Sequence, residues 1–232
     1  MQIEMKVDAG RRQFLQAAVT VAVAGLASRS GIRLPSGGDV HAPVDLSAQS
    51  ALQTLLAGNR RYVANQLTST RSDLTALRRQ TVETQTPFAG VLACADSRVP
   101  VELVFDQSIG QLFVARIAGN IVTPEIIASL EYAVANLGIR ALLVLGHTNC
   151  GAVKAAMEAG AEPGQISALY PHLRPAVVAS RGDYPRAIQL NANGQAELLR
   201  SSSTVIHQAA VAGRLVVAAG VYDLATGRVS VT

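Results

Sequence analysis

The sequence predicts an α/β fold in which a central, mainly parallel β-sheet is flanked by helices. Short apolar runs at 88–94, 112–117 and 141–147 have the length of strands and are bounded by glycine or proline. Segments with helical periodicity lie between these runs. Strands that alternate with helices along a chain form βαβ units, and such units make the strands of a sheet parallel.

Each element has its own signal in the sequence. Ser47 is a candidate N-cap for a helix over 46–65, and Pro87 ends a second helical segment over 71–85. Thr123 as cap and Pro124 in the first turn indicate the start of a helix that runs to Leu137. Beyond the strand at 141–147, we expect helices over 151–159, 165–180 and 195–212, a strand over 215–221 and a hairpin arm over 222–231.

The chain divides into three expected segments. Residues 1–27 resemble an export signal of the twin-arginine type, because Arg11 and Arg12 precede a short apolar run. An amphipathic helix or an uncleaved anchor is the alternative for this segment. Residues 28–45 are rich in Gly, Pro and Ser and are expected to be a linker, followed by one folded domain over 46–232. An exported protein of this type is expected in the bacterial periplasm.

Composition excludes several classes of protein. The 232 residues are 49% hydrophobic and 16% charged, which is typical of a globular domain with a sizeable core. The formal net charge is +4, and no basic stripe interleaved with aromatic residues is present. The sequence therefore does not favour a nucleic-acid partner.

Two motifs follow neighbouring apolar runs. Cys94 ends the first run, and His147 ends another and stands three residues before Cys150. Parallel strands deliver such residues to one edge of the sheet, and two thiolates with one imidazole suit tetrahedral Zn²⁺ with one position left over. The alternative is a disulfide between the two cysteines, the only ones in the chain.

Asp96 and Arg98 follow Cys94 closely. Asp96 is expected either to be the fourth zinc ligand in a closed state or to pair with Arg98 and orient a zinc-bound hydroxide. A bidentate arginine favours the second arrangement. Because two thiolates and a neutral histidine make a formally neutral zinc site, we expect activity that rises with pH. A local salt bridge is the structural alternative for this pair.

These motifs resemble those of the β-class carbonic anhydrases. The likeness rests on Cys94-Ala-Asp96-Ser-Arg98 and on Gly146-His147-Thr-Asn-Cys150, with supporting matches around Arg116. It runs from about residue 58 to 227. The resemblance implies reversible hydration of carbon dioxide to bicarbonate and a proton, with one zinc per chain.

The resemblance also assigns residues and partners. It implies that Cys94, His147 and Cys150 bind zinc, that Asp96 and Arg98 form the catalytic pair, and that Gln85 binds substrate. A polar residue near a helix end is the alternative for Gln85. The family fold implies a homodimer or a dimer of dimers, with active sites near the interface.

Some positions depart from the family pattern. In one branch a second, inhibitory bicarbonate site includes a tryptophan, which is Val91 here, while Arg116 matches the arginine of that site. This site is incomplete, so we expect an open zinc. Alternatives for the function are a carbon disulfide or carbonyl sulfide hydrolase with the same zinc ligands, a non-catalytic zinc-binding module, and a disulfide-linked exported binding protein.

Overall fold

The computed structural model describes residues 46–158 and 163–232. The expected export signal and linker, residues 1–27 and 28–45, lie outside this part of the chain. Among the described residues, no helix has both the length and the apolar character needed to cross a membrane.

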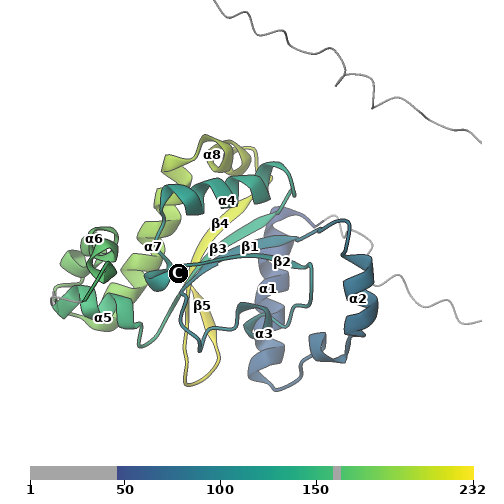
Figure 1. The fold of residues 1–232 in the computed structure, drawn as a ribbon, viewed down its shortest axis with the longest axis horizontal. Coiled ribbons are helices and arrows are strands. Elements are labelled where there is room, and N and C mark those ends of the chain that lie inside the picture. Colours follow the sequence, from purple (N-terminus) through teal and green to yellow (C-terminus); the bar gives the residue numbers. More distant parts are fainter. Residues whose placement is uncertain (1–45, 159–162) are drawn as a thin grey trace, which may run out of the picture. The chain divides into compact units, whose positions relative to one another are not determined.

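One five-stranded sheet forms the centre of the domain (Figure 1). Its spatial order is β2-β1-β3-β4-β5, in which the first four strands are parallel and β5 is antiparallel to β4. The strands are β1 (Ala89–Ala93), β2 (Leu112–Arg116), β3 (Ala141–His147), β4 (Val216–Tyr222) and β5 (Val229–Val231). The predicted fold class and all the predicted strands are therefore confirmed.

The helices occupy both faces of the sheet and its ends. They are α1 (Ala48–Val63), α2 (Leu74–Gln80), α3 (Val101–Val104), α4 (Pro124–Ala135), α5 (Gly151–Glu158), α6 (Tyr170–Ser180), α7 (Tyr184–Ser202) and α8 (Thr204–Val211). Short 3₁₀ helices are η2 (Ser69–Arg71), η3 (Ala118–Asn120) and η4 (Ile166–Leu169).

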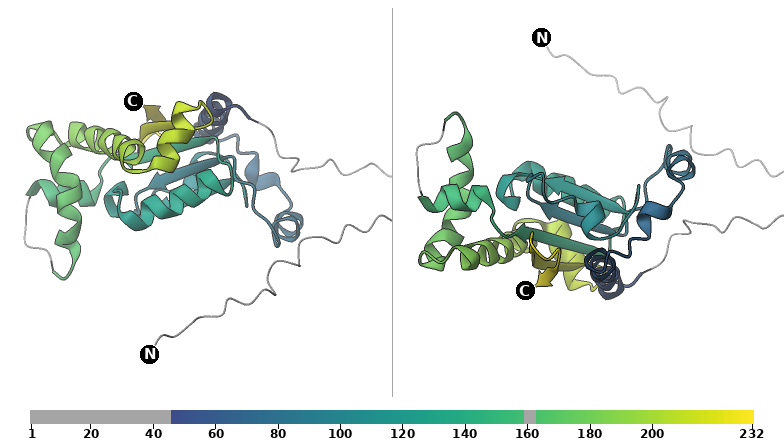
Figure 2. Two further views of the ribbon diagram at one scale, coloured as in Figure 1. Left: turned by 90° about the horizontal axis from the view of Figure 1, so that it is seen from above. Right: turned by 90° about the horizontal axis from the view of Figure 1, so that it is seen from below.

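Alternation along the strands divides the core between these two faces. Val91 and Leu143 pack with the apolar residues of α1 and α3, whereas Leu92 and Leu142 pack with α4, α7 and α8. Because β1 and β3 are covered on both faces, they are buried along their whole length. Figures 1 and 2 show α5 and α6 at one end of the sheet and α2 at the other.

Several helix boundaries differ from prediction. The segment 71–85 is helical only over α2, where the side chain of Asp73 caps the amides of Thr75 and Ala76. Asp73 is the N-cap of α2, and an aspartate at this position accepts readily from the unpaired amides of the first helical turn. The helix predicted over 195–212 is two helices, and α7 begins much earlier, at Tyr184, with Asp183 as its cap.

Two caps were also predicted. Ser47 accepts from the amide of Ser50 at the start of α1, as expected. Thr123 precedes α4 but donates to the Glu125 carboxylate at 2.8 Å, and its side chain caps no backbone amide. Pro124 stands in the first turn, where its fixed φ suits a helix start and its missing N–H leaves one fewer unpaired amide.

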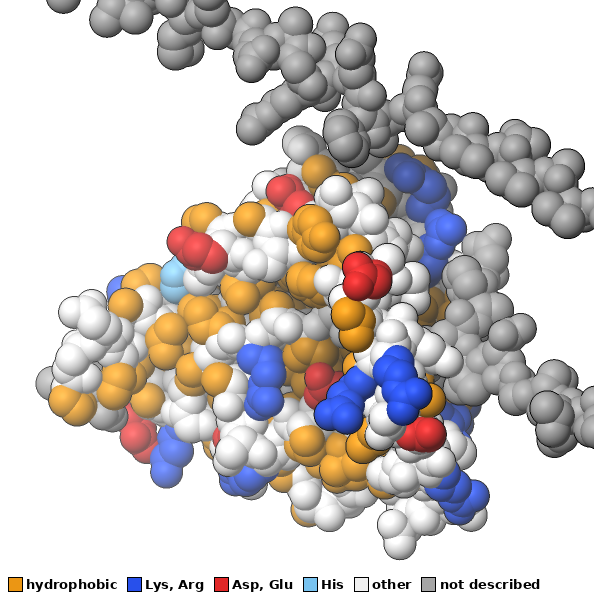
Figure 3. Space-filling view, turned by 45° about the vertical axis from the view of Figure 1, so that its right-hand side comes forward, with side chains coloured by type: hydrophobic (Ala, Val, Ile, Leu, Met, Phe, Trp, Pro, Cys, Tyr) orange, Lys and Arg blue, Asp and Glu red, His pale blue; other side chains and the backbone are white. Residues whose placement is uncertain are grey.

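One face of the domain carries charged and hydrophobic side chains together. On the face in Figure 3, Lys and Arg side chains stand among hydrophobic and acidic ones and form no continuous basic stripe.

Candidate metal centre

Three potential metal ligands meet at the carboxyl ends of the two central strands. Cys94 directly follows β1, His147 is the last residue of β3, and Cys150 directly precedes α5. Their ligand atoms all lie within 4.8 Å of one another, and all three residues are buried. Neither cysteine is in a disulfide, so the disulfide alternative is wrong.

The histidine is oriented as a ligand. Its Nδ1 lies 2.9 Å from the carbonyl oxygen of Thr148, which can only accept, so Nδ1 carries the hydrogen. Nε2 is buried and has no hydrogen-bond partner among the described residues. A buried polar atom without a partner costs free energy unless a ligand satisfies it, and a bare Nε2 lone pair between two thiols fits a soft divalent metal.

The two sulfurs are electrostatically coupled. A hydrogen bond from Cys150 lowers the pKa of Cys94 below its usual range, against the opposing effect of burial. The same interaction raises the pKa of Cys150 above its usual range. The backbone amide of Gly119 also donates to the Cys94 sulfur at 3.3 Å. One sulfur thus ionises easily, and a dication between the two favours ionisation of both.

Asp96 is held by Arg98 beside these ligands. Oδ1 accepts from Arg98 Nε and from the Arg98 backbone amide, both at 2.9 Å, and Oδ2 accepts from Arg98 Nη2 at 2.8 Å. The hydrogen bond from the Arg98 side chain keeps the pKa of Asp96 well below its usual range. Asp96 Oδ2 lies 3.8 Å from Nε2 of His147. The predicted pairing is present, and the carboxylate faces the metal ligands.

Two arginines tie the ligand loops together. Arg98 also donates to the carbonyl of Asn149 at 3.2 Å, which links the loop after β1 to the loop after β3. Arg116 donates to the carbonyls of Cys94 at 3.0 Å and Asp96 at 2.6 Å. The residue that matched an anion-site arginine therefore supports the backbone of the first loop.

Gln85 lies away from the metal ligands. It is exposed in the segment before β1, where it lines a hollow with Tyr132 and Leu137. Cys94 follows the opposite end of the same strand, so one chain does not bring Gln85 to its own metal ligands.

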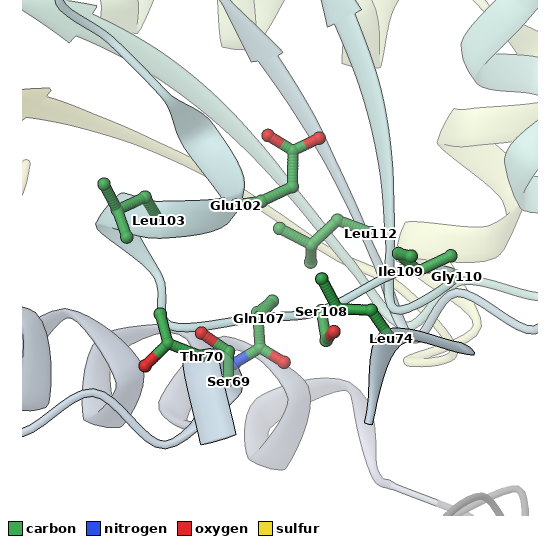
Figure 4. Close-up of a pocket in the computed structure, with 10 residues that line it drawn as sticks. All are labelled: Ser69, Thr70, Leu74, Glu102, Leu103, Gln107, Ser108, Ile109, Gly110 and Leu112. Carbon is green, nitrogen blue, oxygen red and sulfur yellow. The ribbon is translucent and has the colours of Figure 1, made fainter. Parts of the chain in front are cut away.

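The metal ligands do not line the surface hollows of the domain described here. A hollow of about 640 Å³ is lined by residues from η2, α2, α3 and the segment before β2, including Leu74, Leu103 and Ile109 (Figure 4). None of the predicted site residues lines it. The candidate site is the compact group of Cys94, His147 and Cys150.

Sequence reasoning missed several supporting residues. Tyr184 donates to the carbonyl of Cys150 at 2.8 Å, and Asn191 donates to the carbonyl of Gly119 at 2.8 Å. Both belong to α7, whose first half was not predicted. The Asp183-Tyr-Pro start was a usable helix signal, but the contacts depend on tertiary packing.

The fold and the ligands define the class of protein: an α/β protein with a Cys-His-Cys zinc site at the carboxyl edge of a mainly parallel sheet. The chain belongs to the carbonic anhydrase family, whose model matches residues 89–229. A carbonic anhydrase from Mycolicibacterium smegmatis is 35% identical over 188 residues, which cover 78% of this chain and 91% of the relative.

Solved structures agree with this assignment. A Coccomyxa β-carbonic anhydrase, solved in complex with acetazolamide, is 27% identical, with a TM-score of 0.60 over 78% of this chain and 85% of that chain. A tetrameric β-carbonic anhydrase from Sordaria macrospora shares the fold at 23% identity, with a TM-score of 0.63 over 78% of this chain and 95% of that chain.

Proposed function

We propose that this chain catalyses the reversible hydration of carbon dioxide, in which carbon dioxide and water give bicarbonate and a proton. Cys94, His147 and Cys150 hold the zinc. The observation that carries the proposal is the buried, unpartnered Nε2 of His147 between two cysteines, with an arginine-held carboxylate 3.8 Å away. The chain's membership of the carbonic anhydrase family supports it.

Zinc, when bound, supplies an acidified water as nucleophile near neutral pH. Two thiolates and a neutral imidazole compensate the charge of the ion, and the Thr148 carbonyl keeps the imidazole in the ligating tautomer. With three protein ligands, one position remains open for chemistry.

Asp96 acts as the hydrogen-bond acceptor for the nucleophile. Its low pKa keeps it ionised, so it can only accept, and it selects the orientation in which a lone pair points at carbon dioxide. Arg98 occupies both carboxylate oxygens and thereby holds Asp96 away from direct ligation. This arrangement supports the open state rather than the closed one.

Gln85 is proposed to bind substrate in a second copy's site. Within one chain, β1 separates it from the metal ligands, so only an assembly could bring it to a reacting centre. We therefore propose a homodimer or a dimer of dimers. Sedimentation of the intact chain would test this, and a monomer that is fully active and unaffected by Gln85→Ala would overturn the role of Gln85.

Export is proposed from the sequence alone. The paired arginines before an apolar run support twin-arginine transport to the bacterial periplasm. Fractionation of cells that express the full chain, compared with a double variant Arg11→Lys and Arg12→Lys, tests it. We expect the full chain in the periplasm and the variant in the cytoplasm; full export of the variant would contradict the proposal.

Stopped-flow measurement of carbon dioxide hydration tests the main proposal. It should cover about pH 6.5 to 9, with zinc counted on the same sample. We expect rapid hydration that rises with pH and one zinc per chain. Bound zinc without hydration at any pH would overturn the proposal, and carbon disulfide and carbonyl sulfide would then be assayed on that sample.

A further inference from the structure

Two amide side chains on α7 are buried close to the metal centre. Asn191 is 2% exposed and Gln195 is 5% exposed. They stand one helical turn apart, and Gln195 Nε2 donates to Asn191 Oδ1 at 3.2 Å. Buried amides are costly to desolvate, so each is expected to have hydrogen-bond partners.

Both amides bind the segment that follows β2. Asn191 Nδ2 donates to the Gly119 carbonyl at 2.8 Å, and Gln195 Oε1 accepts from the Val122 amide at 2.7 Å. Gln195 Nε2 also donates to the carbonyl of His172 in α6 at 3.1 Å. The pair thus fixes η3 and its exit against α6 and α7.

This segment contacts a metal ligand directly. The Gly119 amide donates to the Cys94 sulfur at 3.3 Å, in a buried environment. Gly119 has a φ of +75°, which favours glycine, and an added Cβ would lie 3.1 Å from a methyl group of Leu173. Backbone conformation and packing therefore leave this amide little freedom, and Asn191 restrains the carbonyl of the same residue.

We propose that Asn191 and Gln195 are positioning residues of the metal centre, which hold the Gly119 amide on the Cys94 sulfur and so adjust how much charge that thiolate donates to the metal. A hydrogen bond to a thiolate withdraws electron density from sulfur, and outer-shell partners of this kind tune a bound metal. The inference rests on the zinc site of the proposed function but not on its substrate.

A purely structural role would give different results. Buried amides that only satisfy backbone groups would change stability when truncated, but not the electronic state of a sulfur ligand. Asn59 provides the matched control. It is 3% exposed, donates to the carbonyls of Val104 and Gly227, and accepts from the Val229 amide. It joins α1 to α3 and to the β4–β5 hairpin, and within the described part of the chain it makes no hydrogen bond with the metal ligands.

The test uses the full chain reconstituted with Co²⁺, whose thiolate-to-metal charge-transfer absorption reports on the sulfur ligands. Asn191→Ala and Gln195→Met are compared with Asn59→Ala and with the unmodified protein. Loss of the hydrogen bond makes the sulfur a stronger electron donor, so we expect the absorption band to move to lower energy in the first two variants. Because the segment that carries Gly119 would no longer be held against α7 and would orient Cys94 less firmly, we also expect release of the metal to a chelator to become about 10-fold faster.

Asn59→Ala should lower the unfolding temperature without changing the band or the release rate. An unchanged band and release rate in Gln195→Met, which preserves side-chain volume, would overturn the proposal even if Asn191→Ala does not fold. If the unmodified protein binds Co²⁺ and the Asn191 and Gln195 variants show the predicted shifts, but zinc-loaded protein does not hydrate carbon dioxide, the proposed function fails while this inference stands.

Discussion

Two aspartates of this domain, each paired with an arginine, have very different surroundings. Asp106 has a fully buried side chain and accepts from Arg61 Nε, from the amide and hydroxyl of Thr68, and from the Ser69 amide. The Asp96 side chain is 17% exposed, and among the described residues only Arg98 donates to it, through its guanidinium and its backbone amide.

The two carboxylates differ in how many further hydrogen bonds they can accept. Asp106 receives donors from α1, η2 and the segment between them, so its carboxylate is saturated and joins three segments. Asp96 has one oxygen with a single strong donor, and that oxygen faces His147. An ion pair alone does not distinguish a structural carboxylate from a functional one. Partial exposure and an unsaturated oxygen beside a metal ligand do.

The largest expected effect is on catalysis. Asp96→Asn removes the acceptor but preserves shape, so we expect kcat for hydration to fall by about 10²- to 10⁴-fold. Zinc content should stay unchanged and the fold should remain, with only a small fall in unfolding temperature, because the ion pair of Asp96 with Arg98 is partly exposed. Stopped-flow kinetics, metal analysis and calorimetry on one sample check this. Loss of zinc with loss of activity would instead make Asp96 a ligand.

The same substitution at the buried site should act on folding. In Asp106→Asn, an NH₂ group replaces one of the two accepting oxygens, so donors from Arg61, Thr68 and Ser69 lose an acceptor. We expect a loss of about 3 kcal/mol in the free energy of unfolding. Denaturant titration measures it. The folded fraction should retain zinc and its kcat. A variant as stable as the unmodified protein would remove Asp106 from its structural role.

Lowering the pH should reveal how much Asp106 contributes to the stability of the fold. Burial alone would raise its pKa, but hydrogen bonds from Ser69, Arg61 and Thr68 outweigh it and keep the pKa below the usual range. The unfolded chain therefore binds a proton first as pH falls. The stabilisation is complete above the unfolded pKa, about 4, and is lost progressively below it. Unfolding midpoints between about pH 5 and 3 should fall less steeply in Asp106→Asn than in the unmodified protein.

The smallest effects should come from the arginines. Arg98→Lys keeps the charge but loses the planar fork, so we expect kcat to fall by about 10-fold. Arg61→Lys should cost about 1 kcal/mol or less of stability, because that side chain is partly exposed and Asp106 keeps its other donors. Kinetics and denaturation of both variants complete the comparison. A change in kcat caused by Arg61→Lys would contradict the separation of roles.

The metal ligands could be predicted from the sequence because the pattern that marks them is local. Cys94 and His147 each end a buried strand, and parallel strands that are neighbours in space bring such ends together. Asn191 carried no such signal, since it lies 72 residues from Gly119 in the chain. Asp106 was also missed, because an aspartate in a connection looks solvated until the partners that fold over it are known.

The boundaries of helices showed the same limit. Ser47 and Pro124 marked true helix starts, since caps act within one turn. The helix predicted over 71–85 is longer than the observed α2, which ends at Gln80. The residues between Gln80 and β1 are irregular. Helical periodicity does not report where tertiary packing stops supporting a helix.

The pairing of β1 with β3 has a consequence for how the sheet chooses its alignment. Ala93 pairs with Leu145, which sets the Cys94 sulfur beside the His147 imidazole. A slip by one residue would turn apolar side chains to the wrong face, but a slip by two would keep every face correct. It would displace Cys94 by about 6.6 Å, more than the whole 4.8 Å span of the ligand atoms. Zinc held by Cys94, His147 and Cys150 would therefore favour the observed alignment over a two-residue slip that hydrophobicity alone would accept.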